Sequence, residues 1–269
     1  MKIILHKNKL KKLIQNEKSL GFVPTMGSIH AGHLDLIKKS ISQSNKTVVS
    51  IFVNRGQFNR KADYLSYPRV LKKDISIIKK LKIDYLFLPT NKQIYPNGVN
   101  NKIKITSFSK KLCGKNRPGH FKSVVDVIDR FLKIINPKYI FLGQKDFQQV
   151  KVIEDYILKN KIKTKVIECK TVREKNGIAY SSRNSLLSYK EKDIGSEIYK
   201  ILLKNKKYII KKKVLISKIK KKIFNLGVHK IDYIKVLNVN NILYRRKKNK
   251  KYRIFIAYYL GDTRLIDNI

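Results

Sequence analysis

The stretch FVPTMGSIHAGHLDL, residues 22–36, decides the expected fold of this chain. It begins as an apolar strand, breaks at Pro24 and Gly27, and continues with helical spacing from His33. Gly27 permits a sharp turn, Gly32 leaves room for a ligand, and the free N–H groups that open a helix favour an anion. The pattern therefore predicts a strand, a turn and a helix that bind a negatively charged group.

Strand-like and helix-like segments alternate along the first 170 residues. Apolar runs of strand length cover residues 21–25, 47–54, 84–89, 139–143 and 165–170, and helical spacing covers 33–43, 66–81, 123–135 and 147–159. In segment 123–135 the apolar residues form one stripe, with Asp126, Asp129, Arg130 and Lys133 expected mostly outside. This alternation predicts an α/β fold with a parallel, helix-covered sheet.

The character of the sequence changes near residue 171. The stretch TVREKNGIAYSSRNSLLS, residues 171–188, is polar and is expected to be a linker or a functional loop. Helical segments at 190–204 and 213–226 and strands at 231–238 and 252–260 follow. We therefore expect a main domain over residues 1–174 and a smaller C-terminal α/β lid domain over residues 175–269.

The composition is strongly basic, with 62 Lys and Arg residues against 18 Asp and Glu residues and a formal net charge of +44. Such a charge raises the possibility of nucleic-acid binding. Lys, Ile and Asn are enriched together along the whole chain, so compositional drift is the preferred explanation and a nucleic-acid partner is not expected. The absence of a long apolar run and the two isolated cysteines predict a cytoplasmic protein without a membrane span.

His30 and His33 are three residues apart at the expected start of a helix. Both imidazoles can therefore reach one anionic group, and phosphate is the favoured ligand. A capping or buried histidine and a zinc pair are the alternatives, although Asp35 alone gives little support to zinc. Neither GxxxxGK[ST] nor GxGxxG occurs, so a nucleotide would have to be bound in another way.

A family resemblance appears in eight stretches that run in order from residue 22 to residue 268. They are VPTMGSIHAGH, VVSIFVNRGQF, YPR, IYPNG, RPGHF, FLGQKDFQQ, REKNGIAYSSRN and LGDTRLIDN. The first resembles the HxGH motif of nucleotidyl-transferring enzymes, and the whole set resembles the pantothenate synthetases. The resemblance implies a Rossmann-like nucleotidyltransferase domain, a homodimer, and condensation of pantoate with β-alanine through a pantoyl-adenylate. ATP would be a substrate that binds together with Mg²⁺, and pyrophosphate and AMP would be released.

The resemblance also implies an ATP site built from three separate stretches. His30, His33 and Lys145 would be the catalytic residues, with His33 as the proton donor and Lys145 opposite the α-phosphate. Arg183 and its neighbouring serines would contact the β- and γ-phosphates, and Val172 would lie against adenine. The full set of implied ATP contacts is Met26, Gly27, Ser28, Ile29, His30, Ala31, Gly32, His33, Gly143, Gln144, Lys145, Asp146, Val172, Tyr180, Ser181, Ser182 and Arg183.

The implied pantoate and β-alanine site contains two glutamines, Gln57 and Gln149, with Asn54 and Tyr67 as further members. Neutral amides can orient a carboxylate without an ion pair that would weaken it as a nucleophile, and they can recognise hydroxyl groups. Asp74 is the carboxylate that the resemblance offers to the metal.

Three stretches depart from the family pattern. Arg55 and Gly56 follow Asn54 where a proline is usual, and this is expected to loosen the loop that carries Gln57. Cys113 replaces a usual glutamate, and Ser123 replaces a usual glycine. Another HxGH enzyme that activates a different acid is the alternative enzyme class, and a nucleic-acid-binding protein is the alternative outside enzymes.

Overall fold

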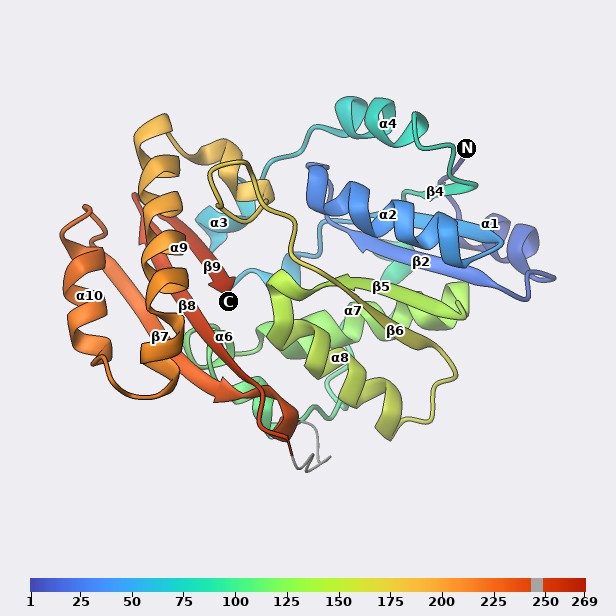
Figure 1. Ribbon diagram of the computed structural model, residues 1–269. Coiled ribbons are helices and arrows are strands. Elements are labelled where there is room, and N and C mark those ends of the chain that lie inside the picture. Colours follow the sequence, from blue (N-terminus) through green and yellow to red (C-terminus); the bar gives the residue numbers. More distant parts are fainter. Residues whose placement is uncertain (243–248) are drawn as a thin grey trace.

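The computed structural model describes residues 1–242 and 249–269, and these residues form two sheets (Figure 1). The larger is a six-stranded parallel sheet in the order β1-β4-β3-β2-β5-β6. Its strands are β1 (Lys2–Ile4), β2 (Leu20–Thr25), β3 (Lys46–Ile51), β4 (Tyr85–Phe87), β5 (Tyr139–Gly143) and β6 (Lys165–Cys169). The smaller, antiparallel sheet contains β7 (Lys230–Asn238), β8 (Tyr252–Leu260) and β9 (Thr263–Asn268). The predicted α/β class, with a Rossmann-like sheet and a smaller C-terminal unit, is confirmed.

Helices cover both faces of the parallel sheet. In Figure 1, α2 (Ala31–Gln43) and α4 (Leu71–Lys79) lie on one side, and α7 (His120–Ile135) and α8 (Phe147–Lys159) lie on the other. The C-terminal sheet is accompanied by α9 (Tyr189–Ile210) and α10 (Ile216–Phe224). The shorter helices are α1 (Lys7–Ile14), α3 (Lys61–Leu65), α5 (Asn91–Ile94) and α6 (Cys113–Asn116).

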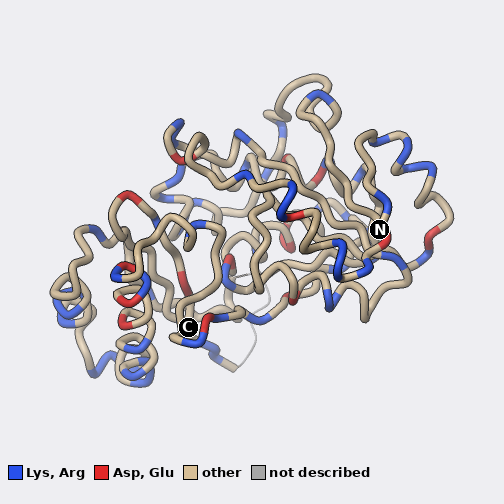
Figure 2. The backbone as a smooth tube through the Cα atoms, turned by 90° about the horizontal axis from the view of Figure 1, so that it is seen from above, with Lys and Arg blue, Asp and Glu red and all other residues tan. Residues whose placement is uncertain are grey.

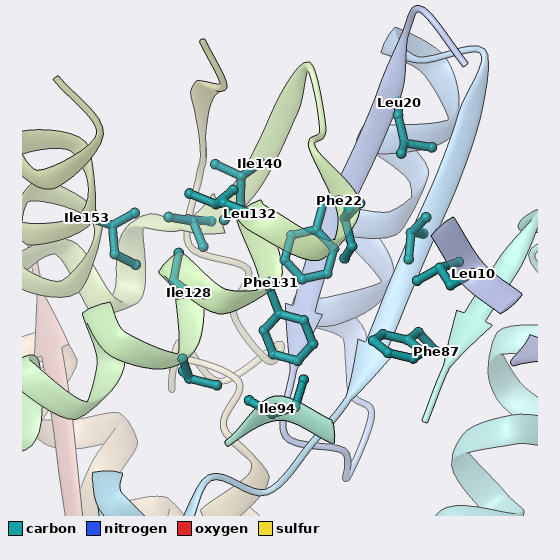
Figure 3. Close-up of a cluster of buried hydrophobic side chains, with 14 of the residues drawn as sticks. Leu10, Leu20, Phe22, Phe87, Ile94, Ile128, Phe131, Leu132, Ile140 and Ile153 are labelled. Carbon is teal, nitrogen blue, oxygen red and sulfur yellow. The ribbon is translucent and has the colours of Figure 1, made fainter. Parts of the chain in front are cut away.

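The core under the sheet is built around the apolar stripe of α7. Phe131 lies with its ring centroid 5.4 Å from that of Phe22 in β2 and 6.2 Å from that of Phe87 in β4 (Figure 3). The expectation that Asp126 and Asp129 point outward is wrong, because each residue is only 3% exposed. Each accepts a hydrogen bond from a basic residue one turn later: Arg130 Nε donates to Asp126, and Lys133 Nζ donates to Asp129, each over 2.7 Å.

The strand order places the ligand site. The chain moves from β2 outward to β3 and β4, whereas β5 pairs with the other side of β2. Ligands of such sheets bind beyond the carboxyl ends of the strands where the winding direction changes. The turns that follow β2 and β5, which contain the HxGH motif and residues Gly143–Asp146, therefore face the same crevice.

Some predicted elements differ from the observed ones. The helix expected from residue 66 begins only at Leu71, because Pro68 restricts the backbone before it and α3 has already ended at Leu65. The strand expected to reach Asn54 ends at Ile51, and α9 is longer than predicted. β1, α1 and β9 were not predicted. The division between residues 174 and 175, and the motion of a lid, stay predictions.

Lys and Arg residues are spread over the whole backbone in Figure 2, from the N-terminal helix to α10. This distribution is what compositional drift predicts, whereas a nucleic-acid interface would gather the cations on one face. Among the described residues, no helix has both the length and the apolar character that a membrane crossing requires.

Candidate functional site

A cavity of about 240 Å³ opens at the carboxyl ends of β2 and β5. Its lining combines the turn after β2, the connection from β3 to α4, the turn after β5 and the loop after β6. The predicted site residues that line it are Met26, His30, Gly32, His33, Asn54, Gln57, Tyr67, Gly143, Lys145, Asp146, Gln149, Val172, Tyr180, Ser181, Ser182 and Arg183. The structure places Gly27, Ser28, Ile29, Ala31, Asp74 and Gln144 outside this lining.

The turn after β2 is held from behind by Asp74. The two carboxylate oxygens accept hydrogen bonds of 2.8 Å from the backbone N–H groups of Ser28 and Ile29. Ser28 has φ of 51° and Gly27 has φ of 79°, so the carboxylate stabilises two successive residues in the left-handed region. Asp74 is 1% exposed and belongs to α4. These contacts make it a support for the turn.

His30 and His33 form a reciprocal cap at the start of α2. The Gly32 N–H donates to His30 Nδ1 over 3.1 Å, and the His30 N–H donates to His33 Nδ1 over 3.4 Å. Both side chains therefore cap the helix, as one of the alternatives from the sequence predicted. Since each Nδ1 accepts a hydrogen bond, the proton of each neutral imidazole is on Nε2. The rings stack with centroids 4.0 Å apart, and both line the cavity.

The environment keeps both imidazoles neutral. Burial, helped by the positive charge of Lys145, lowers the pKa of His30 to about 4. Burial also lowers the pKa of His33 well below its usual range, with His30 and Lys145 adding to the effect. His33 is thus a neutral hydrogen-bond donor, and a proton-carrying role would require a bound anion to raise its pKa.

Gly32 leaves room for the His30 ring. A Cβ atom at residue 32 would lie 3.0 Å from His30 Cε1 and 3.1 Å from His30 Nδ1, so the imidazole would have to shift by a few tenths of an ångström. The sequence predicted that this glycine leaves room for a ligand. The nearer reason is that it leaves room for the histidine that faces the ligand.

The turn after β5 presents Lys145 beside an open position. A Cβ atom at Gly143 would meet nothing within 4 Å, so the backbone is free for close approach. The buried Asn268 of β9 supports this turn by donating to the carbonyl oxygens of Gln144 and Lys145 over 2.7 and 3.0 Å. The side chain of Gln144 points to Glu168 and Arg253 instead of the cavity.

The serine-rich turn η4 (Ser182–Leu186) is fixed to the turn after β2. The Ser182 hydroxyl lies 3.4 Å from the carbonyl oxygen of Gly27 and 3.2 Å from that of Ser28. The Tyr180 ring lies nearly parallel to the His30 ring, with centroids 6.1 Å apart. Two segments more than 150 residues apart in the sequence therefore form one wall of the cavity.

The loop that carries Gln57 is tethered although it lacks the usual proline. The Gln57 carbonyl oxygen accepts a hydrogen bond from Arg117 Nη2 and lies beside His120 Nδ1, each at 2.8 Å. A Cβ atom at Gly56 would lie 3.1 Å from the Ser123 hydroxyl, so these two departures from the family pattern are neighbours. A side chain at residue 56 would therefore crowd the Ser123 side chain.

Arg117 and His120 also line the cavity, and the sequence assigned no role to them. Burial and the nearby Arg183 and Arg264 lower the pKa of Arg117 to about 10. Burial and Arg117 lower the pKa of His120 to about 3. Both residues are in the RPGHF motif, which was the available signal, but their place in the site depends on contacts with a loop 60 residues earlier.

The two adjacent glutamines of α8 have different surroundings. Gln148 is buried, accepts from the Cys113 N–H, and donates to the carbonyl oxygens of Phe108 and Lys111. Gln149 lines the cavity. The Cys113 Sγ atom lies 3.0 Å from the hydroxyl oxygen of Tyr233, a residue of the C-terminal sheet.

The remaining predicted substrate residues, Asn54 and Tyr67, are buried side chains at the cavity wall. Asn54 Nδ2 donates to the carbonyl oxygen of Ser123, and its Oδ1 accepts from the Tyr95 hydroxyl over 3.0 Å. The other N–H of the Asn54 amide has no acceptor among the described residues and thus remains for a ligand.

A parallel sheet with an HxGH histidine pair after its central strand and a basic serine-rich turn opposite defines an α/β nucleotidyltransferase of the HxGH type. Residues 2–269 match the family model described as pantoate-beta-alanine ligase. The chain belongs to this family and is an enzyme of the ligase type.

Relatives and solved structures of this family align with the chain over its full length. A pantothenate synthetase of Thermosipho africanus is 38% identical over 100% of this chain and 99% of its own length, and one of Endomicrobium trichonymphae is 40% identical over 100% and 97%. The structure of the Francisella tularensis ligase, complexed with beta-gamma ATP and beta-alanine, has a TM-score of 0.86 at 36% identity and covers 100% of this chain and 97% of its own. The Thermus thermophilus pantothenate synthetase reaches 0.89 at 28% identity, with coverage of 100% and 99%.

Proposed function

We propose that this chain joins pantoate to β-alanine in two steps within the cavity above β2 and β5. The pantoate carboxylate first attacks the α-phosphorus of ATP, and pyrophosphate leaves to give a pantoyl-adenylate. The amino group of β-alanine then attacks the acyl carbon. The C–O bond to AMP breaks, AMP takes the electron pair, and the amine loses a proton. Family membership supports the overall reaction, and the ligands in the Francisella structure support the use of ATP and β-alanine.

One observation supports adenylation most directly: donors from three segments line a single cavity. They are the Nε2–H groups of His30 and His33, the ammonium of Lys145, and the guanidinium of Arg183. Charge builds up on the phosphate oxygens during attack and departure, and donors fixed in advance stabilise that charge. Neutral imidazoles suit this task because they donate hydrogen bonds to phosphate oxygens without forming an ion pair with the pantoate carboxylate.

The adenosine half of ATP is assigned to the open backbone at Gly143 and to Val172. Met26 and Tyr180 complete the walls on either side of the histidines, and Ser181 and Ser182 supply hydroxyls near the phosphates. Gly27, Ser28, Ile29 and Ala31 act by shaping the turn, since they do not line the cavity. Gln144 acts in the same indirect way.

Pantoate is assigned to Gln57 and Gln149, with Asn54 and Tyr67 at the back of the pocket. Amide groups orient the carboxylate and recognise hydroxyl groups while leaving the carboxylate nucleophilic. They line the same cavity as the proposed phosphate donors, and an attacking carboxylate has to be bound in that cavity.

Mg²⁺ would neutralise part of the triphosphate charge. Asp146 is the only carboxylate among the described residues of the lining, and the described residues contain no group of three or more His, Cys, Asp or Glu side chains that could hold a metal. This donor set fits a cation bound mainly by phosphate oxygens and water, with Asp146 as its protein contact. Asp74 is outside the lining and already accepts hydrogen bonds from two backbone N–H groups, so it is the less suited of the two.

The test is product formation by the purified chain. With ATP, Mg²⁺ and pantoate, we expect pyrophosphate release limited to about one equivalent per active site; addition of β-alanine should start turnover with equal amounts of AMP and pantothenate. Dependence on a different acid, with no response to pantoate, would instead support the alternative HxGH enzyme. Cytoplasmic location and a homodimer stay predictions.

A further inference from the structure

Arg183 is bound to a carboxylate from a distant part of the chain. Its Nε and Nη2 atoms lie 3.3 and 3.0 Å from Asp63 Oδ1, and Nη2 lies 3.1 Å from Asp63 Oδ2. Asp63 belongs to α3, in the connection from β3 to α4, and is 120 residues earlier in the sequence. A fork of this kind fixes the plane of the guanidinium as well as its position.

The opposite edge of the guanidinium is available. Nη1 of Arg183 has no hydrogen-bond partner among residues 1–242 and 249–269, although Arg183 lines the cavity. The guanidinium of Arg183 lies over the Tyr67 ring, with Cζ 5.8 Å from the ring centroid. Asp63 and Tyr67 therefore restrain the group and leave two N–H donors for a ligand.

Electrostatics explain why the carboxylate is needed there. Arg183 and Arg264 are each close enough to Arg117 for their positive charges to lower its pKa, so Arg183 and Arg117 repel each other. Arg264 is paired with Asp232 over 2.8 Å, and Asp63 is the corresponding partner of Arg183. Without Asp63, repulsion would favour Arg183 conformations that point out into solvent.

We propose that Asp63 is a positioning residue that holds Arg183 ready for the β- and γ-phosphates of ATP. The inference rests on the proposed function, in which Arg183 is a phosphate ligand. A mobile arginine would have to be immobilised each time ATP binds, whereas the paired one is already in place. Asp63 thus acts through Arg183 and makes no contact with the reacting atoms.

The experiment compares two nucleotides on the full chain carrying Asp63→Asn. By titration calorimetry, the Kd for a non-hydrolysable β,γ-methylene ATP should rise about three- to tenfold, whereas the Kd for AMP, which lacks the β- and γ-phosphates, should stay the same. In kinetics, the KM for ATP should rise and the KM for pantoate should not. The matched control is Asp35→Asn, which changes the net charge equally but removes only the surface pair with Lys39.

The outcomes separate this inference from the proposed function. Asp63→Asn with equal or tighter binding of the ATP analogue, or with equal weakening of both nucleotides, would overturn it. If Arg183→Ala binds the analogue normally, the phosphate assignment of Arg183 itself fails. The double variant should bind no more weakly than Arg183→Ala alone, and an additive loss would mean that Asp63 acts independently of Arg183. Asp63→Glu, which keeps the charge but moves it, should be intermediate and serves if the asparagine variant does not fold.

Discussion

At the scale of single residues, the site depends on which groups are charged. His30 and His33 are kept neutral by burial and by Lys145, so the cavity combines uncharged donors with a few fixed cations. The same nitrogen atoms that cap α2 determine that Nε2 of each ring carries the proton. One pair of side chains therefore has a structural task at Nδ1 and a proposed chemical task at Nε2.

His33→Ala should lower kcat/KM by about 10²–10³, the loss found when one transition-state donor is removed. The melting temperature should change little, because the remaining cap contacts of α2 persist. Steady-state kinetics and thermal unfolding measure the two effects, with the exposed His229→Ala as control. Wild-type kcat/KM in His33→Ala would remove this residue from the mechanism.

Gln148 and Gln149 form a natural pair for comparison. Gln149→Ala should raise the KM for pantoate about tenfold or more without changing the free energy of unfolding, because the residue lines the cavity. Gln148→Ala should lower the free energy of unfolding by about 1–3 kcal/mol, because it leaves buried backbone groups unpaired. The reverse assignment of the two effects would show that the cavity glutamine has been misidentified.

At the scale of elements, the sheet could be predicted and several connections could not. Buried parallel strands are continuous apolar runs, so β2 to β6 are visible in the sequence. β1 has three residues and buries only Ile4, which leaves no such signal. Pro68 breaks an apparently continuous helical pattern, and the prediction of a helix from residue 66 missed it.

The candidate site was predictable where a motif follows a strand. His30, His33 and Lys145 are in such positions, and they share the cavity with Arg183. Asp63, Arg117 and His120 act through contacts between segments 60 or more residues apart, which local spacing does not reveal. The burial of Asp126 and Asp129 in α7 was missed for a related reason, since it depends on neighbouring elements.

The turn after β2 provides a prediction at this scale. Asp74→Asn replaces one acceptor by a donor that faces the Ser28 or Ile29 N–H, so the free energy of unfolding should fall by about 1–3 kcal/mol. The Mg²⁺ concentration that gives half-maximal activity should stay the same. Urea unfolding and a Mg²⁺ titration measure these quantities. Unchanged stability with a higher Mg²⁺ requirement would instead make Asp74 a metal ligand.

At the scale of the whole molecule, both sheets contribute to one site. Asn268 from the C-terminal sheet holds the Lys145 turn, and Ser182 holds the turn after β2. Three histidines in this region have pKa values lowered by burial, about 4 for His30, about 3 for His120 and well below normal for His33. Their shared environment links the protein's stability to pH.

The direction of this linkage follows from proton uptake. Below about pH 6.5 the histidines of the unfolded chain become protonated. In the folded protein, His30 is protonated only near pH 4 and His120 only near pH 3. The free energy of unfolding should therefore fall as the pH falls from 6.5 toward 4, and the loss should be shallower in His120→Asn. Urea unfolding at a series of pH values tests this. A free energy of unfolding that rises as the pH falls from 6.5 toward 4 would contradict the assignment of neutral imidazoles.

The central claim is that the histidine pair, the Lys145 turn and the serine-rich turn bind one triphosphate. A crystal structure of the chain with a non-hydrolysable ATP analogue measures this directly. The account predicts phosphate oxygens within hydrogen-bond distance of His30 or His33 Nε2, Lys145 Nζ and Arg183 Nη1 in the same cavity. A nucleotide bound elsewhere, or phosphates that contact only one of the three segments, would contradict it.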